Sequence, residues 1–259
     1  MDHFFKKPNE KFLNLLKLSK FSKEDLIYKV LPRFMMEIMT KYFRLEIEGA
    51  ENLPKKGPGI ILPNHSGYAG FDAFILAYHT HQITKRVAKV LTHPLWFWSE
   101  TTAIPATKLG FFEATTANGL KFLKDKQLVI LFPEGEMGNF KPSTKKYRLQ
   151  EFKRGFVRMA IQTQSPIVPT LVIGAEETHI NLRQLQLTKY LSGLVLPLPL
   201  NVLPLPAKWK VKFLEPIEVP YKPQQYKDHE LVHEIASDVQ ERMQLAINRE
   251  LKQRDSVFF

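Results

Sequence analysis

Short apolar runs that alternate with helix-forming segments limit the possible folds of this chain more than any other property of its sequence. The apolar runs have the length of buried strands, and they cover residues 60–62, 128–132 and 166–173. Helices are predicted from Asp72 onward, near 117–124 and at 155–164. Strand–helix–strand units of this kind build a parallel sheet with helices on its faces. We therefore predict an α/β protein with one domain and a mostly parallel central sheet flanked by helices.

The ends of the chain extend this pattern. Residues 44–48 and 208–219 alternate between apolar and polar side chains, as strands do, and residues 49–59 form a loop rich in Gly and Pro. Residues 228–252 predict a closing amphipathic helix. Its apolar face would consist of Val232, Ile235, Val239, Met243 and Ala246.

The N-terminal part mixes apolar and basic residues. From Ser22, a suitable N-cap, to about Tyr42 the sequence predicts a helix bent at Pro32. Its large apolar side chains lie among lysines and arginines, a composition that suits a membrane surface, an adaptable groove or an ordinary packing helix. We divide the chain into an N-terminal helical region at 1–43, which could interact with a membrane, and a main domain at 44–259. Charged residues interrupt any signal-peptide core near the start, so we expect a mature protein that begins near Met1.

Composition narrows the partners only partly. The 259 residues are 44% apolar, enough for a sizeable core, and they contain no cysteine. Disulfides, a thiolate nucleophile and Cys-ligated zinc are therefore excluded, in agreement with a reducing compartment. A net charge of +11 favours anionic partners, which include nucleic acid, an acidic membrane face, a phosphorylated substrate and an acidic carrier protein.

Two apolar stretches stand apart from the strand pattern. Residues 191–207 carry no charge, but their four prolines forbid a spanning helix, so we predict an apolar loop that acts as a lid or a membrane foot. The WFW cluster at 96–98 suits either the water–lipid boundary or an aromatic core cluster.

The first apolar run leads into PNHSGYAGFD, where Pro63 stops the strand and the glycines allow a turn. His65 then lies on a loop, with Asp72 at the start of the next helix. A carboxylate on one ring nitrogen orients a histidine so that the other nitrogen can take a proton from a substrate hydroxyl. The hydroxyl could then attack an activated acyl carbon directly. From these two residues alone, a structural pair is an equal alternative.

A second turn, FPEGE at 132–136, leaves the end of the next apolar strand, where open α/β sheets place binding groups. Glu134 and the amide of Gly135 are well placed there to hold a polar acceptor.

One motif competes with this interpretation. His229, Glu230 and His233 match the HExxH pattern of zinc proteases on a predicted helix. The usual third-ligand patterns do not follow, and Glu250 is an unsupported candidate for that ligand. We therefore predict no metal site and keep a zinc hydrolase that uses His229 and His233 as a remote alternative.

Four motifs in order resemble the glycerolipid and lysophospholipid acyltransferases. They are NH followed by D (Asn64, His65, Asp72), LGFFEATTANG (109–119), FPEG (132–135) and PIVPTLVIGAEE (166–177). In the family's common pattern four residues separate the histidine and the aspartate, whereas six separate His65 and Asp72 here. This wider spacing and the stretch at 146–160 are similar to those of branches related to monoacylglycerol acyltransferases.

This resemblance implies roles for particular residues. It makes His65 the general base and Asp72 its orienting carboxylate. It makes Phe132, Pro133, Glu134 and Gly135 acceptor-binding residues. Substrate binding would also involve Asn64, Gly110 and Pro169 from the other motifs. No cofactor is expected, because acyl-CoA or acyl carrier protein enters as a co-substrate.

The second motif departs from the family. It often carries an arginine thought to hold the acceptor phosphate, whereas Glu113, Thr115 and Thr116 occupy that neighbourhood here. We therefore expect a neutral or zwitterionic acceptor to be used at least as well as lysophosphatidic acid. Lys108, Lys121 or a basic residue after FPEG could substitute for the arginine.

Basic residues follow the FPEG turn in unusual density. They are Lys141, Lys145, Lys146, Arg148, Lys153, Arg154 and Arg158. Such a group suits a coenzyme A diphosphate or an acidic acyl carrier, and a solvated face near anionic lipid explains it equally well.

The sequence thus predicts an O-acyltransferase that moves a fatty acyl group from a thioester donor to a lipid hydroxyl. We expect it to be peripheral, on the cytoplasmic side of an anionic membrane, with no nucleic-acid partner. The alternative of another class is a basic membrane-binding protein without catalysis.

Overall fold

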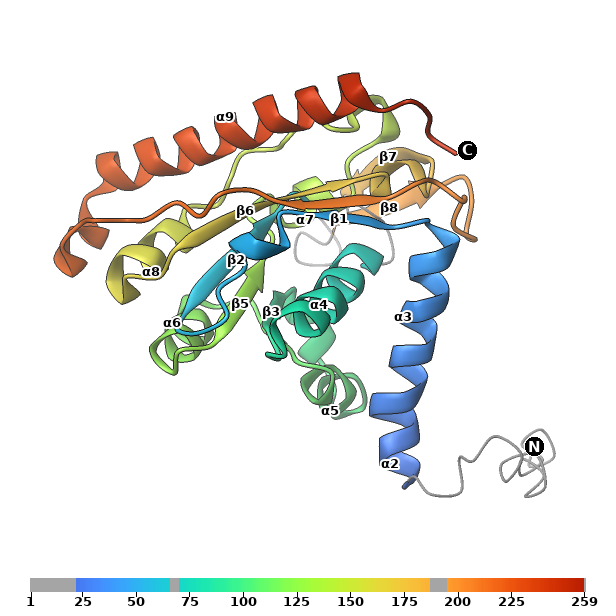
Figure 1. Cartoon of the computed structure of the whole chain (residues 1–259), viewed down its shortest axis with the longest axis horizontal. Coiled ribbons are helices and arrows are strands. Elements are labelled where there is room, and N and C mark those ends of the chain that lie inside the picture. The colour runs from blue at the N-terminus through green and yellow to red at the C-terminus, as the bar shows by residue number, and fades with distance from the viewer. Residues whose placement is uncertain (1–21, 66–69, 187–194, 259) are drawn as a thin grey trace.

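The structure, a computed structural model, describes residues 22–65, 70–186 and 195–258, and it is built around a seven-stranded sheet (Figure 1). The order of the strands across the sheet is β1-β9-β6-β2-β5-β3-β4. Their bounds are β1 Glu46–Glu48, β2 Gly59–Pro63, β3 Lys89–Thr92, β4 Phe111–Glu113, β5 Leu128–Leu131, β6 Ile167–Ile173 and β9 Lys210–Phe213. Neighbouring strands are parallel except for β6 and β9. The mostly parallel sheet predicted from the apolar runs is confirmed.

Helices cover both faces of this sheet (Figure 1). One face is covered by α3 Leu31–Tyr42, α4 Phe71–Thr84 and α5 Glu100–Lys108. The other is covered by α6 Thr116–Lys124, α8 Gly155–Thr163 and α9 His229–Gln253. Shorter pieces are α2 Lys23–Asp25, α7 Gly135–Asn139, a π-helical turn at Leu26–Val30 and 3₁₀ turns at Ala50–Asn52, Pro94–Phe97, Ser143–Lys145, Ala175–Glu177 and Pro223–Lys227. The arrangement is a three-layer α/β/α domain.

Strand periodicity explains why the central strands are apolar throughout. Successive side chains point to opposite faces, so Ile60 and Leu62 of β2 enter the core under α8 and α9, whereas Ile61 enters the core under α4. Both faces are covered, and a strand buried on both sides has no polar positions to spare. This is the physical reason that the runs at 60–62 and 128–132 do not alternate.

The C-terminal helix follows its predicted pattern. Asp228 caps α9 by accepting hydrogen bonds from the amides of Glu230 and Leu231, both at 3.1 Å. Val232, Val239 and Met243 are fully buried on its inner face. The predicted amphipathic helix is confirmed.

The proline-rich apolar stretch requires a correction. Part of it is a strand, β8 Val195–Pro199, which pairs antiparallel with β7 Asn181–Gln186 in a separate two-stranded sheet. The prediction of a loop over 191–207 is therefore wrong for these five residues, while 191–194 lie outside the described residues. Proline is tolerated here because a two-stranded sheet leaves one side of each strand unpaired.

The N-terminal region is helical, as predicted, from Lys23 to Tyr42, with the Ser22 hydroxyl accepting from the Asp25 amide at 3.1 Å. A stripe of apolar side chains on this region, repeating every three or four residues, is exposed. The stripe consists of Ile27, Leu31, Phe34, Met35, Ile38 and Tyr42. Phe43, in contrast, is fully buried and stacks on Trp209 with ring centroids 4.4 Å apart. The helix is thus anchored at one end and presents an unpacked apolar face.

Two further observations concern apolar surface. Trp96 and Trp98 are exposed, Trp98 to 87%, so the aromatic core cluster considered for the WFW stretch is wrong for the two tryptophans. Phe97 between them is partly buried and packs against the core. Among the described residues, no helix combines the length and the apolar composition needed to cross a membrane.

Candidate active site

A cleft of about 790 Å³ opens at the carboxyl ends of β2, β5, β3 and β4, the edge where parallel sheets bind ligands. Apolar side chains make up most of its described lining. The polar side chains of the lining are those of His65, Thr92, His93, Glu136, Asn139 and Lys153. The cleft therefore offers an apolar chamber with a few ionisable groups, as expected of a site for a lipid-like substrate.

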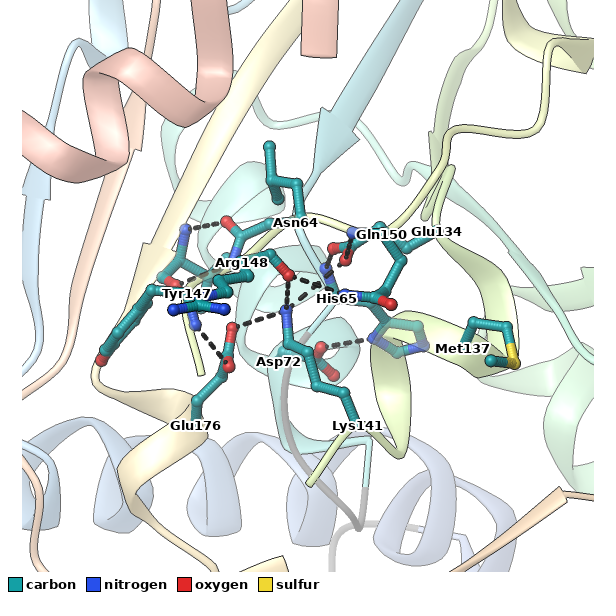
Figure 2. Close-up of polar contacts among 12 residues, drawn as sticks. Asn64, His65, Asp72, Glu134, Met137, Lys141, Tyr147, Arg148, Gln150 and Glu176 are labelled. Carbon is teal, nitrogen blue, oxygen red and sulfur yellow. Dashed lines mark hydrogen bonds and ion pairs between the residues drawn. The ribbon is translucent and has the colours of Figure 1, made fainter. Parts of the chain in front are cut away.

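The side chains of His65 and Asp72 are hydrogen-bonded to each other in this cleft (Figure 2). The Nδ1 atom of His65 lies 2.7 Å from Oδ2 of Asp72, and Oδ1 accepts the Ala73 amide at 2.8 Å. The His65 side chain is 15% exposed and that of Asp72 is fully buried. A carboxylate can only accept, so Nδ1 carries the proton and Nε2 remains as a base toward the cleft. The wider spacing of six residues thus keeps the two side chains in contact.

The aromatic ring of Phe132 supports the same histidine. The two ring centroids are 4.1 Å apart in a stacked arrangement, and both residues line the cleft. Stacking limits rotation of the imidazole, which favours a fixed direction for Nε2.

Glu134 supports His65 from the inside of the molecule (Figure 2). Its buried carboxylate accepts the His65 amide at 2.8 Å and the Gln150 amide at 2.7 Å. The prediction that Glu134 contacts an acceptor is therefore corrected, because backbone amides behind the cleft occupy its carboxylate. Glu134 joins the β5 turn to the loop that carries His65.

Lys141 completes a buried charge cluster with two glutamates (Figure 2). Its ammonium lies 2.9 Å from Glu176 and 3.4 Å from Glu134, and it donates to the Arg148 carbonyl at 3.3 Å. Burial raises the pKa of Glu176 to about 7, against the opposing effect of Lys141. Lys141 was grouped with the basic residues that could meet a donor diphosphate, and its burial makes that assignment wrong.

Two glycines make the turn possible. A Cβ on Gly138 would lie 2.3 Å from Cβ of Glu134, so only glycine leaves room for the buried carboxylate. Gly135 has a φ of +57°, and its amide donates to the Phe132 carbonyl at 3.2 Å. The amide predicted to be free for an acceptor is thus used within the turn.

The remaining predicted residues lie outside the cleft. Asn64 is fully buried and exchanges two hydrogen bonds with Val172 of β6, at 2.7 and 3.1 Å. Pro133 is buried behind the turn, where its carbonyl accepts the Lys153 amide at 2.8 Å. Pro169 pairs with Leu62 inside the sheet, and Gly110 precedes β4 at the amino ends of the strands. The structure does not bring these four to the substrate cleft, because three of them contribute to backbone pairing in the sheet and Pro133 is enclosed behind the turn.

His93 and Glu136 form a second pair in the cleft that the sequence analysis missed. His93 Nε2 lies 2.6 Å from Glu136 Oε1, and the two residues follow the neighbouring strands β3 and β5. KVLT before His93 contains only two apolar residues, so the sequence does not predict that strand. Glu136 was read only as part of the FPEGE turn.

The other basic residues divide by position. Lys153 lines the cleft beside Gly135, with no carboxylate of the described residues within ion-pair distance. Arg158 instead contacts the His229 ring at 3.1 Å, and Lys108 pairs with Glu24. Neither Lys108 nor Lys121 is among the described lining residues, so neither replaces an arginine in the cleft.

The zinc-protease pattern has no supporting geometry in the described part of the chain. His229, Glu230 and His233 are exposed on the outer side of α9. The described residues contain no group of three histidines or carboxylates that could hold a metal ion.

The fold and the cleft together define an α/β protein with a histidine–carboxylate pair at the carboxyl edge of a parallel sheet. A family model named Acyltransferase matches residues 44–173, and the chain belongs to this family, within the glycerolipid acyltransferase superfamily.

Known relatives agree with this assignment. An uncharacterized protein of Mycobacterium tuberculosis is 34% identical over 246 residues, covering 90% of this chain and 68% of that protein. A 1-acyl-sn-glycerol-3-phosphate acyltransferase of Limnanthes alba is 31% identical over 147 residues, covering 54% of this chain and 48% of that protein.

The fold is also that of a solved structure. The crystal structure of the 1-acyl-sn-glycerophosphate (LPA) acyltransferase PlsC from Thermotoga maritima superimposes with a TM-score of 0.56. The two chains are 16% identical, and the match covers 95% of this chain and 90% of that one. This likeness extends the shared fold beyond the matched family region, and it bears on the fold alone.

Proposed function

We propose that this acyltransferase moves a fatty acyl group from acyl-CoA or acyl carrier protein to a hydroxyl of a glycerolipid or lysophospholipid, with His65 as the general base. The observation that carries the proposal is the contact between His65 Nδ1 and Asp72 in a largely apolar cleft. A base held in one tautomer, with its other nitrogen toward a chamber that suits acyl chains, is the arrangement that direct acyl transfer needs.

The proposed reaction requires no nucleophile from the protein. Nε2 of His65 takes the proton of the acceptor hydroxyl while its oxygen attacks the carbonyl carbon of the thioester. The tetrahedral intermediate then collapses as its carbon–sulfur bond breaks, and the thiolate leaves with the proton returned by the imidazolium. Asp72 stabilises the imidazolium between these two events.

Lys153 is the proposed cation for the donor. Its ammonium stands at the cleft beside the FPEG turn, where the phosphates of coenzyme A or an acidic carrier protein could meet it. This role replaces the broader basic group considered from the sequence, because Lys153 is its only member among the described lining residues of the cleft.

A neutral or zwitterionic acceptor remains our proposal. The described lining of the cleft contains one lysine and no arginine, so a phosphate monoester would lack a bidentate partner there. A monoacylglycerol, a diacylglycerol or a lysophospholipid with a capped phosphate should therefore serve at least as well as lysophosphatidic acid.

The test is an assay of purified protein with one labelled acyl-CoA and these acceptors. We expect transfer to fall by about a thousandfold in His65→Ala, as expected when a general base is lost, with the thermal transition preserved. His233→Ala is the matched control, since it removes an exposed imidazole of α9 that is not among the described lining residues of the cleft. Near-normal turnover by His65→Ala would remove the histidine from the mechanism, and a clear preference for lysophosphatidic acid would reject the acceptor class.

We also propose peripheral attachment to the cytoplasmic face of an anionic membrane. The exposed stripe on the N-terminal helical region, defined above, ends beside a second apolar group at Val202 and Leu203. The Tyr42 hydroxyl donates to the Pro204 carbonyl at 2.7 Å, which holds these two surfaces together. Apolar side chains flanked by basic residues are suited to the boundary of an anionic bilayer.

Flotation with anionic vesicles tests this attachment. Replacing Phe34 and Ile38 by serine should weaken partitioning by more than tenfold, because two large side chains no longer enter the bilayer. The control is serine at Val87 and Leu245, which are similarly exposed elsewhere. Equal loss in both double variants, or protein that never floats, would contradict the proposal.

A further inference from the structure

The pair formed by His93 and Glu136 faces the same cleft as His65 but has no part in the proton transfer described above. Its two side chains are 40% and 28% exposed, so they are accessible from the cleft. They follow β3 and β5, and His65 follows β2, so all three groups come from adjacent strands. A substrate that reaches His65 must therefore occupy a space bordered by this pair.

The charge of the pair limits what that substrate can be. Among the described residues that line the cleft, Glu136 is the one carboxylate, because Asp72 and Glu134 are buried behind the surface. A carboxylate accepts hydrogen bonds and donates none, so it attracts a hydroxyl and repels a phosphate dianion. Its position two residues after Glu134, which holds the His65 amide, ties it to the reacting end of the cleft.

We propose that Glu136, oriented by His93, is the specificity-determining residue for the acceptor and accepts a hydrogen bond from a second free hydroxyl of a neutral glyceride. This inference rests on the proposed function and deepens it. The acceptor class is a glyceride with two neighbouring hydroxyls: one gives its proton to His65, and the other is held by Glu136. His93 is a positioning residue that fixes the carboxylate at 2.6 Å.

A merely structural pair would bind strand ends together without affecting the choice of acceptor. Substrate preference distinguishes a structural role from a role in specificity, since the loss of a purely structural contact changes the turnover of every acceptor equally. A site built to pair a hydroxyl discriminates strongly against ligands that cannot supply one.

The experiment measures kcat/KM of the purified full chain for 1-monoacylglycerol and for lysophosphatidic acid, with one acyl-CoA donor. Glu136→Gln keeps the size of the side chain and removes its charge. We expect the ratio of lysophosphatidic acid to monoacylglycerol to rise by about tenfold, mainly through KM for the neutral acceptor. His93→Ala should shift the ratio in the same direction, and His93→Gln, which can still donate to Glu136, should restore it to within about twofold.

Glu151→Gln is the matched control. It removes the same charge from a side chain that is 85% exposed and is not among the described lining residues of the cleft. The same shift in Glu136→Gln and Glu151→Gln, or no shift in either, would overturn the inference while leaving acyl transfer established.

Direct binding of the two acceptors to each variant, by calorimetry in a non-ionic detergent, makes the test independent of turnover. Wild-type protein should bind monoacylglycerol more tightly, and Glu136→Gln should lose that preference. If no acceptor is acylated but this pattern is seen, the proposed function fails and the binding site stands. Tighter wild-type binding of lysophosphatidic acid would refute the site.

Discussion

The two histidine–carboxylate pairs of the cleft contain the same chemical groups in different surroundings. His65 and Asp72 are 15% and 0% exposed, whereas His93 and Glu136 are 40% and 28% exposed. A buried carboxylate must keep its partner, since leaving it unpaired is costly, while a partly solvated one can exchange its partner for a ligand. The difference in burial agrees with the proposed roles, in which the buried pair transfers the proton and the more exposed pair binds the acceptor.

The turn after β5 shows this difference within three residues. Glu134 points inward to the amides of His65 and Gln150, and Glu136 points to the cleft. One glutamate thereby holds the backbone of His65, and the other lines the cleft. Substitutions that exchange the properties of these groups can test the contrast.

Replacing the carboxylate of each pair should have the largest effect. In Asp72→Asn we expect kcat to fall by about a thousandfold, because the amide no longer favours the tautomer with a basic Nε2. In Glu136→Gln, kcat for the neutral acceptor should fall by less than about tenfold, since that carboxylate holds the substrate only. Steady-state kinetics at saturating donor measures both values, and equal losses would mean that the two pairs share one role.

The second effect concerns stability. Glu134→Gln should lower the free energy of unfolding by about 3 kcal/mol, because it leaves the buried Lys141 with one carboxylate fewer and weakens two backbone hydrogen bonds. Glu136→Gln, which alters a partly exposed pair, should change it by less than about 1 kcal/mol. Urea unfolding followed by circular dichroism compares the two variants. A Glu134→Gln protein as stable as wild type would show that the buried cluster does not support the His65 loop.

The smallest expected effect is a pH dependence of the folding stability, which comes from the buried Glu176. Burial raises the pKa of Glu176 from its ordinary value of 4.5 to about 7. Between these two pH values the folded state therefore holds a proton on Glu176 that the unfolded chain has released. The associated stability is complete below about pH 4.5 and is lost as the pH rises to about 7.

Glu176→Gln should remove this dependence. Relative to wild type, the variant should gain about 1 to 3 kcal/mol between pH 5 and pH 8, measured by urea unfolding at each pH. Glu177→Gln is the control, because Glu177 is paired with Arg254 instead of Lys141. A constant difference between wild type and Glu176→Gln across this range would contradict the assignment.

Much of the fold could be predicted because its signals are local. The runs at 60–62 and 128–132 are apolar at every position, and this composition identifies strands that are covered on both faces. The α9 helix shows the 3.6-residue period and begins at its predicted cap, Asp228. β3 was missed because KVLT offers only two apolar residues before His93, too short a run for periodicity to separate from a loop.

The site could be predicted only in part for a related reason. His65 and Asp72 are close in sequence and belong to one motif, so the sequence could name them as a pair. Their contact, at 2.7 Å, is a result of the structure. Glu134 and Gly135 were assigned to the acceptor from position alone, and burial and hydrogen bonding reversed both assignments. Pro169 and Gly110 also fell outside the cleft, because a motif does not show at which end or on which face of a sheet its residues lie.

The residues alone were enough for the class of sheet, the acyltransferase resemblance and the identity of the first histidine–carboxylate pair, since each depends on composition or spacing within a few residues. The meeting of His93 with Glu136, and of Lys141 with Glu176, depends on which strands become neighbours and which side chains are enclosed. Strand order and burial are products of the whole packed chain. For this reason, only the folded molecule distinguishes Glu134, which accepts the His65 amide, from Glu136, which lines the cleft.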